Sequence, residues 1–411
     1  KAKCWGQSRE HGLIATELKE IKGKVLSLSL GRKHSCAITE TGTAWCWGDN
    51  TYGQLANDAN TFTNDLGLVQ GITQPIISIA TGYEHTCAVL ADHQVRCWGR
   101  NYSGVLGIGN SIKIPLHPTA TLDGPVKDLK GLCALTITGS VYCWGYNHAS
   151  RLESVPNNIK YYAGKIQSLG DDNVALATGV DHGCAAPKAG GVKCWGSNRY
   201  GQLGDNGFFN STAAISVQGI SEPVTALAAG PYYTCALTQV GQVKCWGRNN
   251  FQLFQANGPE VIYEAVLVEN TPPDIKSIVA GELHVCVLTQ QEAVHCWGSN
   301  DSGQLGLGDN QRHQGIVSVP TLEQDVKLIA AGLYHTCALL NTGAVKCWGS
   351  NYVSQITTKD PTCYSVCNFP TLVSWVKSSA IRVTASGDST CIQTSDYVVL
   401  CNGVKWGSGS D

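Results

Sequence analysis

Residues 332–349 read Gly-Leu-Tyr-His-Thr-Cys-Ala-Leu-Leu-Asn-Thr-Gly-Ala-Val-Lys-Cys-Trp-Gly, and this pattern recurs along the chain. Two runs of residues with strand propensity flank a short polar segment, and each run carries one cysteine. Such pairs, ten residues apart, occur eight times: Cys36 with Cys46, Cys87 with Cys97, Cys133 with Cys143, Cys184 with Cys194, Cys235 with Cys245, Cys286 with Cys296, Cys337 with Cys347, and Cys391 with Cys401. The sequence therefore predicts eight copies of one β-hairpin.

The first copy shows why the two cysteines are expected to face each other. If Cys36 lies opposite Cys46 on antiparallel strands, a three-residue loop remains at positions 40–42. Such loops usually end in a left-handed residue, and this place holds Gly42 here and glycine in four other copies. Directly opposed residues lie within disulfide reach. We therefore predict one structural disulfide in each hairpin, worth about 2–3 kcal/mol by chain entropy.

Three of the 19 cysteines lie outside the hairpins. Cys363 and Cys367 are expected to pair within their own insertion. Cys4 is then the odd cysteine, which is free, joined to another chain, or engaged where the repeats close on themselves. Because disulfides persist in oxidising compartments, the sequence predicts a secreted or cell-surface protein.

The spacing of the repeats predicts the architecture. The first cysteines of successive hairpins are 51, 46, 51, 51, 51, 51 and 54 residues apart. Each unit offers about four short strands, such as 326–331 before a hairpin and 213–217 after one, without a helical period. Repeated four-stranded sheets are typical of a β-propeller. We predict an all-β chain that forms one propeller domain over residues 1–411, with eight blades by the hairpin count.

Two motifs carry a family resemblance. Gly-x-x-His-Thr-Cys-Ala-Leu at 332–339 and Trp-Gly-x-Asn-x-x-Gly-Gln-Leu-Gly at 195–204 and 297–306 resemble the repeats of the regulator of chromosome condensation family. That resemblance implies a propeller of typically seven blades. This chain departs from it with eight hairpins and a cysteine pair in each. Propellers usually close with a blade built from both termini, yet 4–6 and 401–403 look like copies of one strand and cannot fill the same place.

Histidine and tryptophan recur in register with the hairpins. Both patterns have a structural interpretation, because equivalent positions in a propeller lie on different blades. We expect the histidines to make structural hydrogen bonds, and the tryptophans to pack between blades. The recurring residues are His34, His85, His182, His284 and His335, with Trp5, Trp47, Trp98, Trp144, Trp195, Trp246, Trp297 and Trp348.

Composition and motifs argue against several classes of function. Lys plus Arg number 29 against 31 Asp plus Glu, without a long basic run, so we expect no nucleic-acid partner. The chain contains no stretch of 18 apolar residues, so we expect no membrane span. Neither a nucleophile elbow, a P-loop nor a zinc-protease motif occurs. The sequence therefore predicts a protein that is not an enzyme and that uses no metal or cofactor.

The variable loops between strands are the expected recognition elements, since a rigid scaffold with varied loops is a common binding design. Exposed aromatic residues there can anchor a partner, or can simply cover blade edges. The candidates are Tyr52, Tyr102, Tyr200, Phe208, Phe209, Phe251, Phe254 and Tyr352. Three sequons also occur, at Asn101, Asn210 and Asn300, and Asn210 in a variable loop is the best glycosylation candidate.

These features favour a secreted binding or assembly scaffold. Its partner is another protein, a glycan, or further copies of the chain, which would form an extracellular filament. A secreted enzyme inhibitor is the alternative, suggested by a resemblance to bacterial propellers of this fold that inhibit β-lactamases. Nuclear members of the resembled family exchange nucleotides on a small GTPase, a function that the disulfides make less suitable here.

Overall fold

The computed structural model describes residues 2–4, 16–18, 21, 24–30, 34–57, 66–82, 84–100, 118–130, 133–143, 164–250, 253–254, 258–322, 325–356, 363–374, 376, 378–395 and 399–403. Over these residues the regular secondary structure consists of strands and one short 3-10 helix, η1 (Gln167–Leu169). No helix in the same ranges has the length and apolarity needed to cross a membrane. The strands form eight separate sheets, which we call blades 1–8 in chain order.

In blades 1–7 the four strands follow one another from the centre of the molecule outward, and blade 8 has five strands. Blade 1 contains β3 (Val25–Leu30), β4 (His34–Thr39), β5 (Ala44–Gly48) and β6 (Gly67–Leu68). Blade 2 contains β7 (Ile76–Thr81), β8 (His85–Leu90), β9 (Gln94–Gly99) and β10 (Pro118–Thr121). Blade 3 contains β11 (Val126–Lys130), β12 (Cys133–Thr136), β13 (Val141–Cys143) and β14 (Gly164–Lys165). Blade 4 contains β15 (Asn173–Thr178), β16 (His182–Pro187), β17 (Lys193–Gly196) and β18 (Ser211–Ser216).

The second half of the ring repeats this plan. Blade 5 contains β19 (Val224–Ala229), β20 (Tyr233–Thr238), β21 (Val243–Arg248) and β22 (Val261–Leu267). Blade 6 contains β23 (Ile275–Ala280), β24 (His284–Thr289), β25 (Val294–Gly298) and β26 (Val317–Ser318). Blade 7 contains β27 (Val326–Ala331), β28 (His335–Leu340), β29 (Val345–Ser350) and β30 (Val366–Leu372). Blade 8 contains β31 (Ala380–Ser386), β32 (Ser389–Thr394) and β33 (Val399–Gly403), then β1 (Ala2–Cys4) and β2 (Thr16–Leu18).

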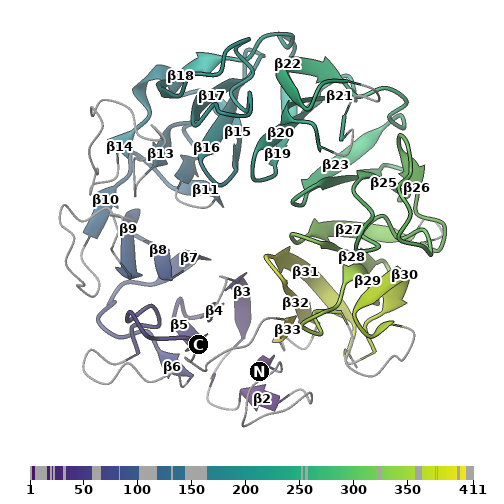
Figure 1. The fold of residues 1–411 in the computed structure, drawn as a ribbon. Coiled ribbons are helices and arrows are strands. Elements are labelled where there is room, and N and C mark those ends of the chain that lie inside the picture. The colour runs from purple at the N-terminus through teal and green to yellow at the C-terminus, as the bar shows by residue number, and fades with distance from the viewer. Residues whose placement is uncertain are drawn as a thin grey trace.

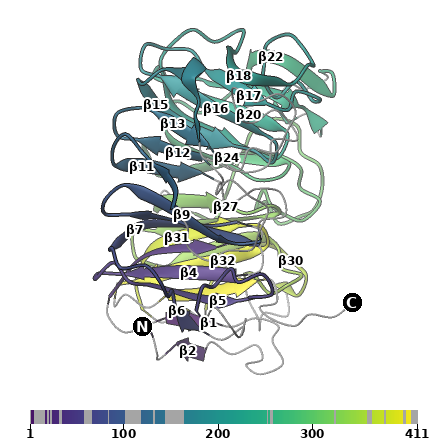
Figure 2. The same cartoon turned by 90° about the vertical axis from the view of Figure 1, so that its left-hand side faces the viewer.

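The eight blades stand around a common centre, with the first strand of each innermost (Figure 1). Seen from the side, the sheets are stacked one above another (Figure 2). The predicted propeller is therefore confirmed, with the eight blades of the hairpin count and not the seven typical of the resembled family. Every innermost strand carries a register shift near its start, for example between Val326 and Leu328. Such bulges increase the local twist of a sheet.

The clamped hairpins have the predicted disulfides. Cys337 lies opposite Cys347 in register, and the two are bridged. Six other hairpins contain the same bridge: Cys36 with Cys46, Cys87 with Cys97, Cys133 with Cys143, Cys184 with Cys194, Cys235 with Cys245, and Cys286 with Cys296. In blade 8, Cys391 is disulfide-bonded and faces Cys401 in register.

The hairpin loops also have the predicted backbone. The last loop residue is left-handed, with φ 75° at Gly42 and 81° at Gly343. His93 and Glu292 occupy this place without being glycine, at φ 66° and 64°. A left-handed backbone is costly for residues that carry a Cβ, so these two loops hold strain that the glycine loops avoid.

Replacing His93 with glycine is expected to stabilise the protein by about 1 kcal/mol, because a side chain in the left-handed region costs roughly 1–2 kcal/mol. The added backbone freedom of glycine in the unfolded chain offsets part of that gain. Urea unfolding of His93→Gly against the parent measures the change. Gly343→Ala is the matched control, and it should destabilise because a Cβ there would collide with Ser379. A lower midpoint for His93→Gly than for the parent would contradict this interpretation.

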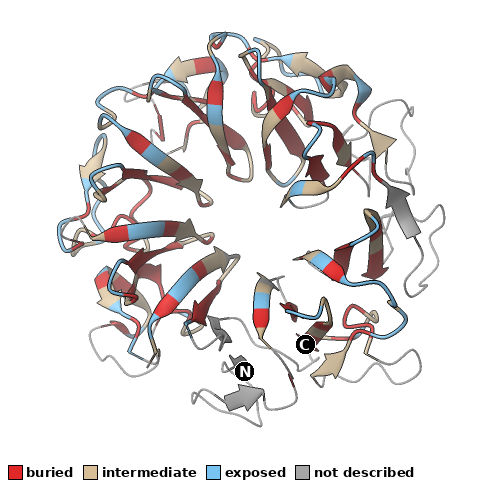
Figure 3. Cartoon of the chain, turned by 180° about the vertical axis from the view of Figure 1, so that it is seen from behind, coloured by how far each residue is buried: buried red, intermediate tan, exposed pale blue. Residues whose placement is uncertain are grey.

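The hydrophobic core lies between the blades. Each of eight buried clusters joins two neighbouring blades, as when Trp348 of blade 7 packs on Leu305 and Val319 of blade 6. Figure 3 shows buried residues, in red, within the strands of the blades, and exposed residues, in pale blue, in many loops and on parts of the innermost strands. The tryptophans that the structure describes in these clusters are Trp47, Trp98, Trp195, Trp246, Trp297 and Trp348. Their predicted packing between blades is confirmed.

Blade 8 combines strands from distant parts of the sequence. Strand β1 runs parallel to β33, with Cys4 beside Cys401, and β2 pairs with β1 in the antiparallel sense. In the other seven blades the fourth strand is antiparallel to the third. Strand β1, which ends at Cys4, thus lies beside β33 and does not take its place, near the bottom of Figure 1. That the whole chain is a single domain stays a prediction.

Candidate functional site

The turn after the third strand of a blade is built by two buried amide side chains. In blade 4, Asn198 Oδ1 accepts the backbone N–H of Leu203 at 2.9 Å. Gln202 Oε1 accepts the backbone N–H of Tyr200 at 2.8 Å. The Asn bond recurs at Asn50, Asn249, Asn300 and Asn351, and the Gln bond at Gln54, Gln304 and Gln355. The motif therefore fixes the backbone of the turn, and the residue two places after the asparagine, such as Tyr200, is half-buried within it.

The turns of blades 1, 4 and 6 are held by the next blade. The indole nitrogen of Trp246 donates to the backbone oxygen of Gln202 at 3.0 Å, across the boundary between blades 4 and 5. Trp98 and Trp348 make the same bond to Gln54 and Gln304. The residues that the turns present at this end of the propeller are therefore held on a rigid frame. We call this end the turn end.

The recurring histidines join blades in the same way. His284 Nε2 lies 2.9 Å from Thr336 Oγ1 of the next blade, and His34, His182 and His335 make the equivalent contact. The imidazole of His284 lies over Gly281, where a Cβ would collide with it. Burial lowers the pKa of His284 and of His34 to about 3, and that of His335 and of His85 to about 4. The predicted structural hydrogen bond is confirmed for His34, His182, His284 and His335, whose side chains are buried, whereas His85 is half-buried.

Aromatic and arginine side chains gather at the turn end of blades 4 and 5, the blades at the top of Figure 1. Phe208 and Phe209 are 61% and 74% exposed, with ring centroids 4.4 Å apart. Their loop is fixed to blade 5, since the Asn206 N–H donates to the Tyr263 backbone oxygen at 2.9 Å. We call this set the blade 4–5 surface; it consists of Arg199, Tyr200, Phe208, Phe209, Tyr232, Arg248 and Tyr263.

The arginines of this surface stack on its tyrosines. Tyr200 and Tyr232 have centroids 5.0 Å apart, and the Arg248 guanidinium lies 5.2 Å and 5.7 Å from those two rings. Arg199, which is exposed, lies 5.6 Å from the Tyr200 centroid. Tyrosine and arginine are the residue types that dominate binding energy at protein interfaces, because they offer large, rigid contact area with polar ends. The arrangement can therefore anchor a protein partner.

A second exposed aromatic group lies on blade 7. Tyr352 and Tyr364 are 74% and 89% exposed, and Phe369 is also exposed on β30. The segment is fixed by the predicted disulfide between Cys363 and Cys367, which the structure contains. Gly308 of blade 6 donates its N–H to the Asn368 oxygen at 2.9 Å, so β30 is also held by its neighbour. Among the residues that the structure describes, no arginine lies over the rings of this group, in contrast to the blade 4–5 surface.

The predicted partner contacts have different outcomes. Tyr200, Phe208 and Phe209 come together on the blade 4–5 surface, whereas Tyr352 lies on blade 7 and Tyr52 on blade 1. The prediction for Phe254 was wrong, because its side chain is 4% exposed and packs in the core beside Tyr233. Its N–H donates to Asn249 Oδ1, so it takes the place of the buried leucine in the turn motif. Tyr102 and Phe251 lie outside the described residues.

Sequence reasoning missed the members of the surface that come from strands and from the loop before the hairpin. These are Tyr232, Arg248 and Tyr263. A signal was present, since Arg248 follows its Trp-Gly step as Arg100 does in blade 2, and Phe254 stands five residues after Asn249. Counting positions from the recurring Trp-Gly step and asparagine would have predicted the place of Arg248 and the burial of Phe254.

The sequons are placed unequally. Asn300 is 1% exposed, and its amide nitrogen donates to Asp309 and to the Gln311 backbone oxygen at 3.0 Å. That nitrogen is the atom a glycan would occupy, so the folded turn excludes one and the prediction for Asn300 was wrong. Asn210 is exposed at the edge of the blade 4–5 surface, where its Oδ1 accepts the Asn198 N–H at 2.9 Å. Asn101 and the side chain of Cys4 lie outside the described residues.

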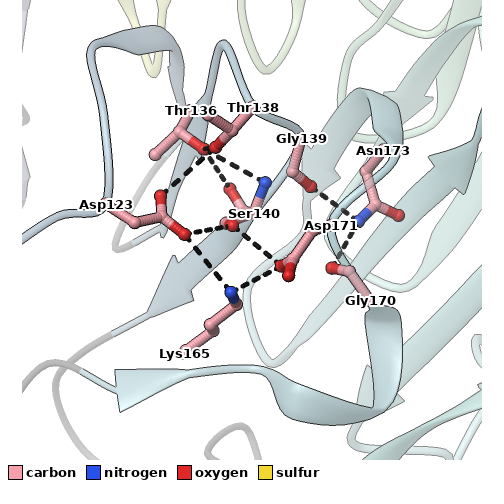
Figure 4. Close-up of polar contacts among 9 residues, drawn as sticks. All are labelled: Asp123, Thr136, Thr138, Gly139, Ser140, Lys165, Gly170, Asp171 and Asn173. Atoms are coloured by element: carbon pink, nitrogen blue, oxygen red, sulfur yellow. Dashed lines mark hydrogen bonds and ion pairs between the residues drawn. The ribbon is translucent and has the colours of Figure 1, made fainter.

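A polar cluster joins blades 3 and 4 (Figure 4). Lys165 lies 3.2 Å from Asp123 and 2.5 Å from Asp171, and the Ser140 hydroxyl is within hydrogen-bond distance of both carboxylates. Burial raises the pKa of Asp123, but hydrogen bonds from Ser140 and Lys165 outweigh it and leave that pKa below its usual value. Hydrogen bonding to Asp171, the largest cause, raises the pKa of Lys165. The charges satisfy one another, so we interpret the cluster as a structural link.

Replacing Lys165 with methionine is expected to lower the free energy of unfolding by about 1 kcal/mol or less, since Asp171 is well solvated and exposed ion pairs contribute little. Chemical denaturation at pH 7 measures the change. High salt should narrow the difference between the two proteins, because it screens the lost attraction. A binding role for the cluster would instead be indicated by lost partner affinity with unchanged stability.

No group of three or more His, Cys, Asp or Glu side chains with metal-binding geometry occurs in the part of the chain that the structure describes.

Comparison with known proteins identifies the repeat family of the chain. The regulator of chromosome condensation (RCC1) repeat matches residues 25–54, 76–105, 174–202, 224–252, 275–304 and 326–355, and a second form of it matches 41–89 and 292–339. Together these matches span more than half of the chain. The ultraviolet-B receptor UVR8 of Arabidopsis thaliana is 26% identical over 313 residues, 72% of this chain and 70% of the receptor. Protein pim1 of Schizosaccharomyces pombe is 28% identical over 388 residues, 80% of this chain and 70% of pim1.

Other relatives are larger or are similar in fold alone. The probable E3 ubiquitin-protein ligase HERC6 of Homo sapiens is 30% identical over 287 residues, which are 65% of this chain but 28% of the ligase. Human WBSCR16 superposes with a TM-score of 0.63 at 18% identity, covering 92% of this chain and 88% of that one. Prp20p of Saccharomyces cerevisiae, described with its binding to Gsp1p and histones, gives 0.60 at 19% identity, covering 98% and 88%.

Proposed function

This chain belongs to the regulator of chromosome condensation (RCC1) repeat family, and from that premise we propose that it is a non-enzymatic scaffold that binds a protein partner through the blade 4–5 surface. The observation that carries the proposal is the exposed Phe208–Phe209 pair, whose loop is bonded to Tyr263 of blade 5, together with two arginines over a tyrosine ring on the same two blades. Exposed aromatic rings on a rigid frame lose little entropy on binding, which favours affinity. The yeast relative Prp20p binds proteins, so the fold is compatible with this use.

The disulfides support a location in an oxidising compartment. Seven hairpin bridges and the bridge between Cys363 and Cys367 are formed, and Cys391 is bridged as well. Thiols of cytosolic and nuclear proteins are kept reduced, so such a set is typical of secreted or surface proteins. The scaffold we propose is therefore secreted or displayed at the cell surface, unlike a nuclear exchange factor.

Cross-linking of the tagged protein in the fluid or at the surface of its source cells, followed by mass spectrometry, tests the proposal. We expect one protein to be recovered by the parent chain and to be lost with Phe208→Ser/Phe209→Ser. The matched control is Tyr352→Ser/Tyr364→Ser, which removes equally exposed rings from blade 7 and should retain the partner. Equal recovery by both double variants would overturn the assignment of the surface, and loss with the control alone would move it to blade 7.

Self-assembly is the second candidate, and blade 8 is the observation that favours it. The parallel β1–β33 contact is formed by only three residue pairs, so the same β33 edge can receive β1 from another copy. Sedimentation of the parent chain and of a chain lacking residues 1–18 tests this. Polymers formed by the parent and lost on deletion support strand exchange, and a monomeric parent at high concentration excludes it.

A further inference from the structure

Two arginines occupy the same place in different blades. Arg100 of blade 2 and Arg248 of blade 5 each follow a Cys-Trp-Gly step, and their backbone N–H groups donate to Glu84 and Tyr232 at 2.8 Å and 3.0 Å. Each guanidinium lies over a tyrosine of the preceding blade, at 4.6 Å for Arg100 over Tyr52 and 5.2 Å for Arg248 over Tyr200. The chain thus contains an internal comparison between two equivalent sites.

The sites differ in how the positive charge is balanced. Arg100 forms an ion pair with Glu84, the residue before the hairpin histidine. The corresponding residue of blade 5 is Tyr232, so an aromatic ring stands where the carboxylate would be. Among the described residues no carboxylate pairs with Arg248 or with Arg199. These guanidinium groups therefore lie over tyrosine rings, and the described residues supply no carboxylate to pair with them.

That arrangement has the chemistry of a carboxylate receptor. A guanidinium presents its N–H groups in a planar fork that matches the two oxygens of a carboxylate, and stacking fixes the fork before the partner arrives. Phe208 and Phe209 offer apolar contact on the same surface. A polyanion fits poorly, because the exposed Glu260 adjoins Val261, the register partner of Arg248, and the whole chain has a net charge of −2.

We propose that Arg248, assisted by Arg199, binds an aspartate or glutamate side chain of an acidic peptide segment, whose neighbouring apolar residue rests on Phe208 and Phe209. This inference rests on the proposed function, and it names the partner's recognition element. It also assigns Tyr232 a purpose, since a carboxylate at that position would neutralise Arg248 from within the chain, as Glu84 does for Arg100.

An array of peptides tests the proposal, each with one Asp or Glu beside apolar residues and each made again with Asn or Gln. Fluorescence anisotropy of the binding members should give at least about tenfold tighter binding for the acid than for its amide, as expected for hydrogen bonds between ionised groups. Arg248→Gln should remove that preference. Tyr232→Glu should remove it as well, with the arginine still present, whereas Arg100→Gln should leave it unchanged.

The outcomes separate this inference from the proposed function. Equal binding of acid and amide forms, still lost with Phe208→Ser/Phe209→Ser, overturns the carboxylate receptor and leaves the protein-binding surface intact. A preference for acids that survives both Arg248→Gln and Tyr232→Glu places the receptor elsewhere and overturns the assignment. Failure of every acidic peptide to bind also overturns it, and the cross-linking experiment then decides the proposed function independently. Circular dichroism of each variant confirms that the fold is retained.

Discussion

Reduction of the hairpin disulfides is expected to unfold the propeller at neutral pH. Seven described bridges each join cysteines 10 residues apart, and a ring of that size contributes about 2–3 kcal/mol in the chain-entropy account. Seven such contributions reach roughly 14–21 kcal/mol, above the net stability of about 5–15 kcal/mol that is usual for a domain. The fold therefore depends on the bridges as a set.

Urea unfolding followed by tryptophan fluorescence, with and without reductant at equilibrium, measures this effect. The contribution of one bridge is tested by Cys337→Ala/Cys347→Ala. This variant should keep the fold, with a free energy of unfolding about 2–3 kcal/mol lower. Because the cysteines are buried, reduction is expected to be slow until urea opens the blades. An unchanged midpoint in fully reduced protein would show that inter-blade packing alone supports the propeller.

Acid is expected to destabilise the protein steeply below pH 6.5, through its buried histidines. The pKa is lowered from 6.5 to about 3 in His34 and His284, and to about 4 in His85 and His335, chiefly by burial. The unfolded chain then binds protons before the folded one, so stability is full above pH 6.5 and falls as the pH drops toward the folded-state pKa. Between pH 7.5 and 5 each ring should cost about 2 kcal/mol, and the four together about 8 kcal/mol.

Blade 5 supplies the matched variant for this test. There Tyr233 takes the histidine's place and donates to the backbone oxygens of Gly281 and His284, and the facing threonine is replaced by Val285. His284→Tyr with Thr336→Val copies that natural pair into the next boundary. Denaturation at pH 7.5 and 5 should show an acid loss about 2 kcal/mol smaller than in the parent. The same acid loss in both proteins would mean that other groups govern the transition.

Much of the fold follows from the repeat because local and tertiary signals agree there. The cysteine register, the glycine of the hairpin loop and the innermost strand Val25–Leu30 all appear as expected. Each is set by residues within one hairpin or its neighbour. The bulge that shifts the register of every innermost strand carries no marker residue, since its extra position holds Leu26, Lys127 and Thr225 in different blades. It arises from the twist of the assembled sheet, which no single strand specifies.

The candidate surface was only partly predictable for a similar reason. Phe208 and Phe209 stand out because a variable loop rarely needs two phenylalanines, and both are exposed. Phe254 has the same composition and lies in the core, because the deciding quantity is its distance from Asn249 and not its loop. Arg248 and Tyr232 meet Tyr200 only across a blade boundary. Pairs of that kind become visible when residues are compared between blades.

Because the core lies between blades, one boundary of the ring joins residues that are far apart in the sequence. Seven boundaries join neighbouring repeats, such as the contact of His284 with Thr336 at a separation of 52 residues. The eighth joins blade 8 to blade 1, where Gln393 donates to the Val25 oxygen across 368 residues. Closing the longer loop costs about 1–2 kcal/mol more in chain entropy. The boundary between blade 8 and blade 1 is therefore the least favourable one to close. Heat or force is expected to separate these two blades at Val25 before any other boundary opens.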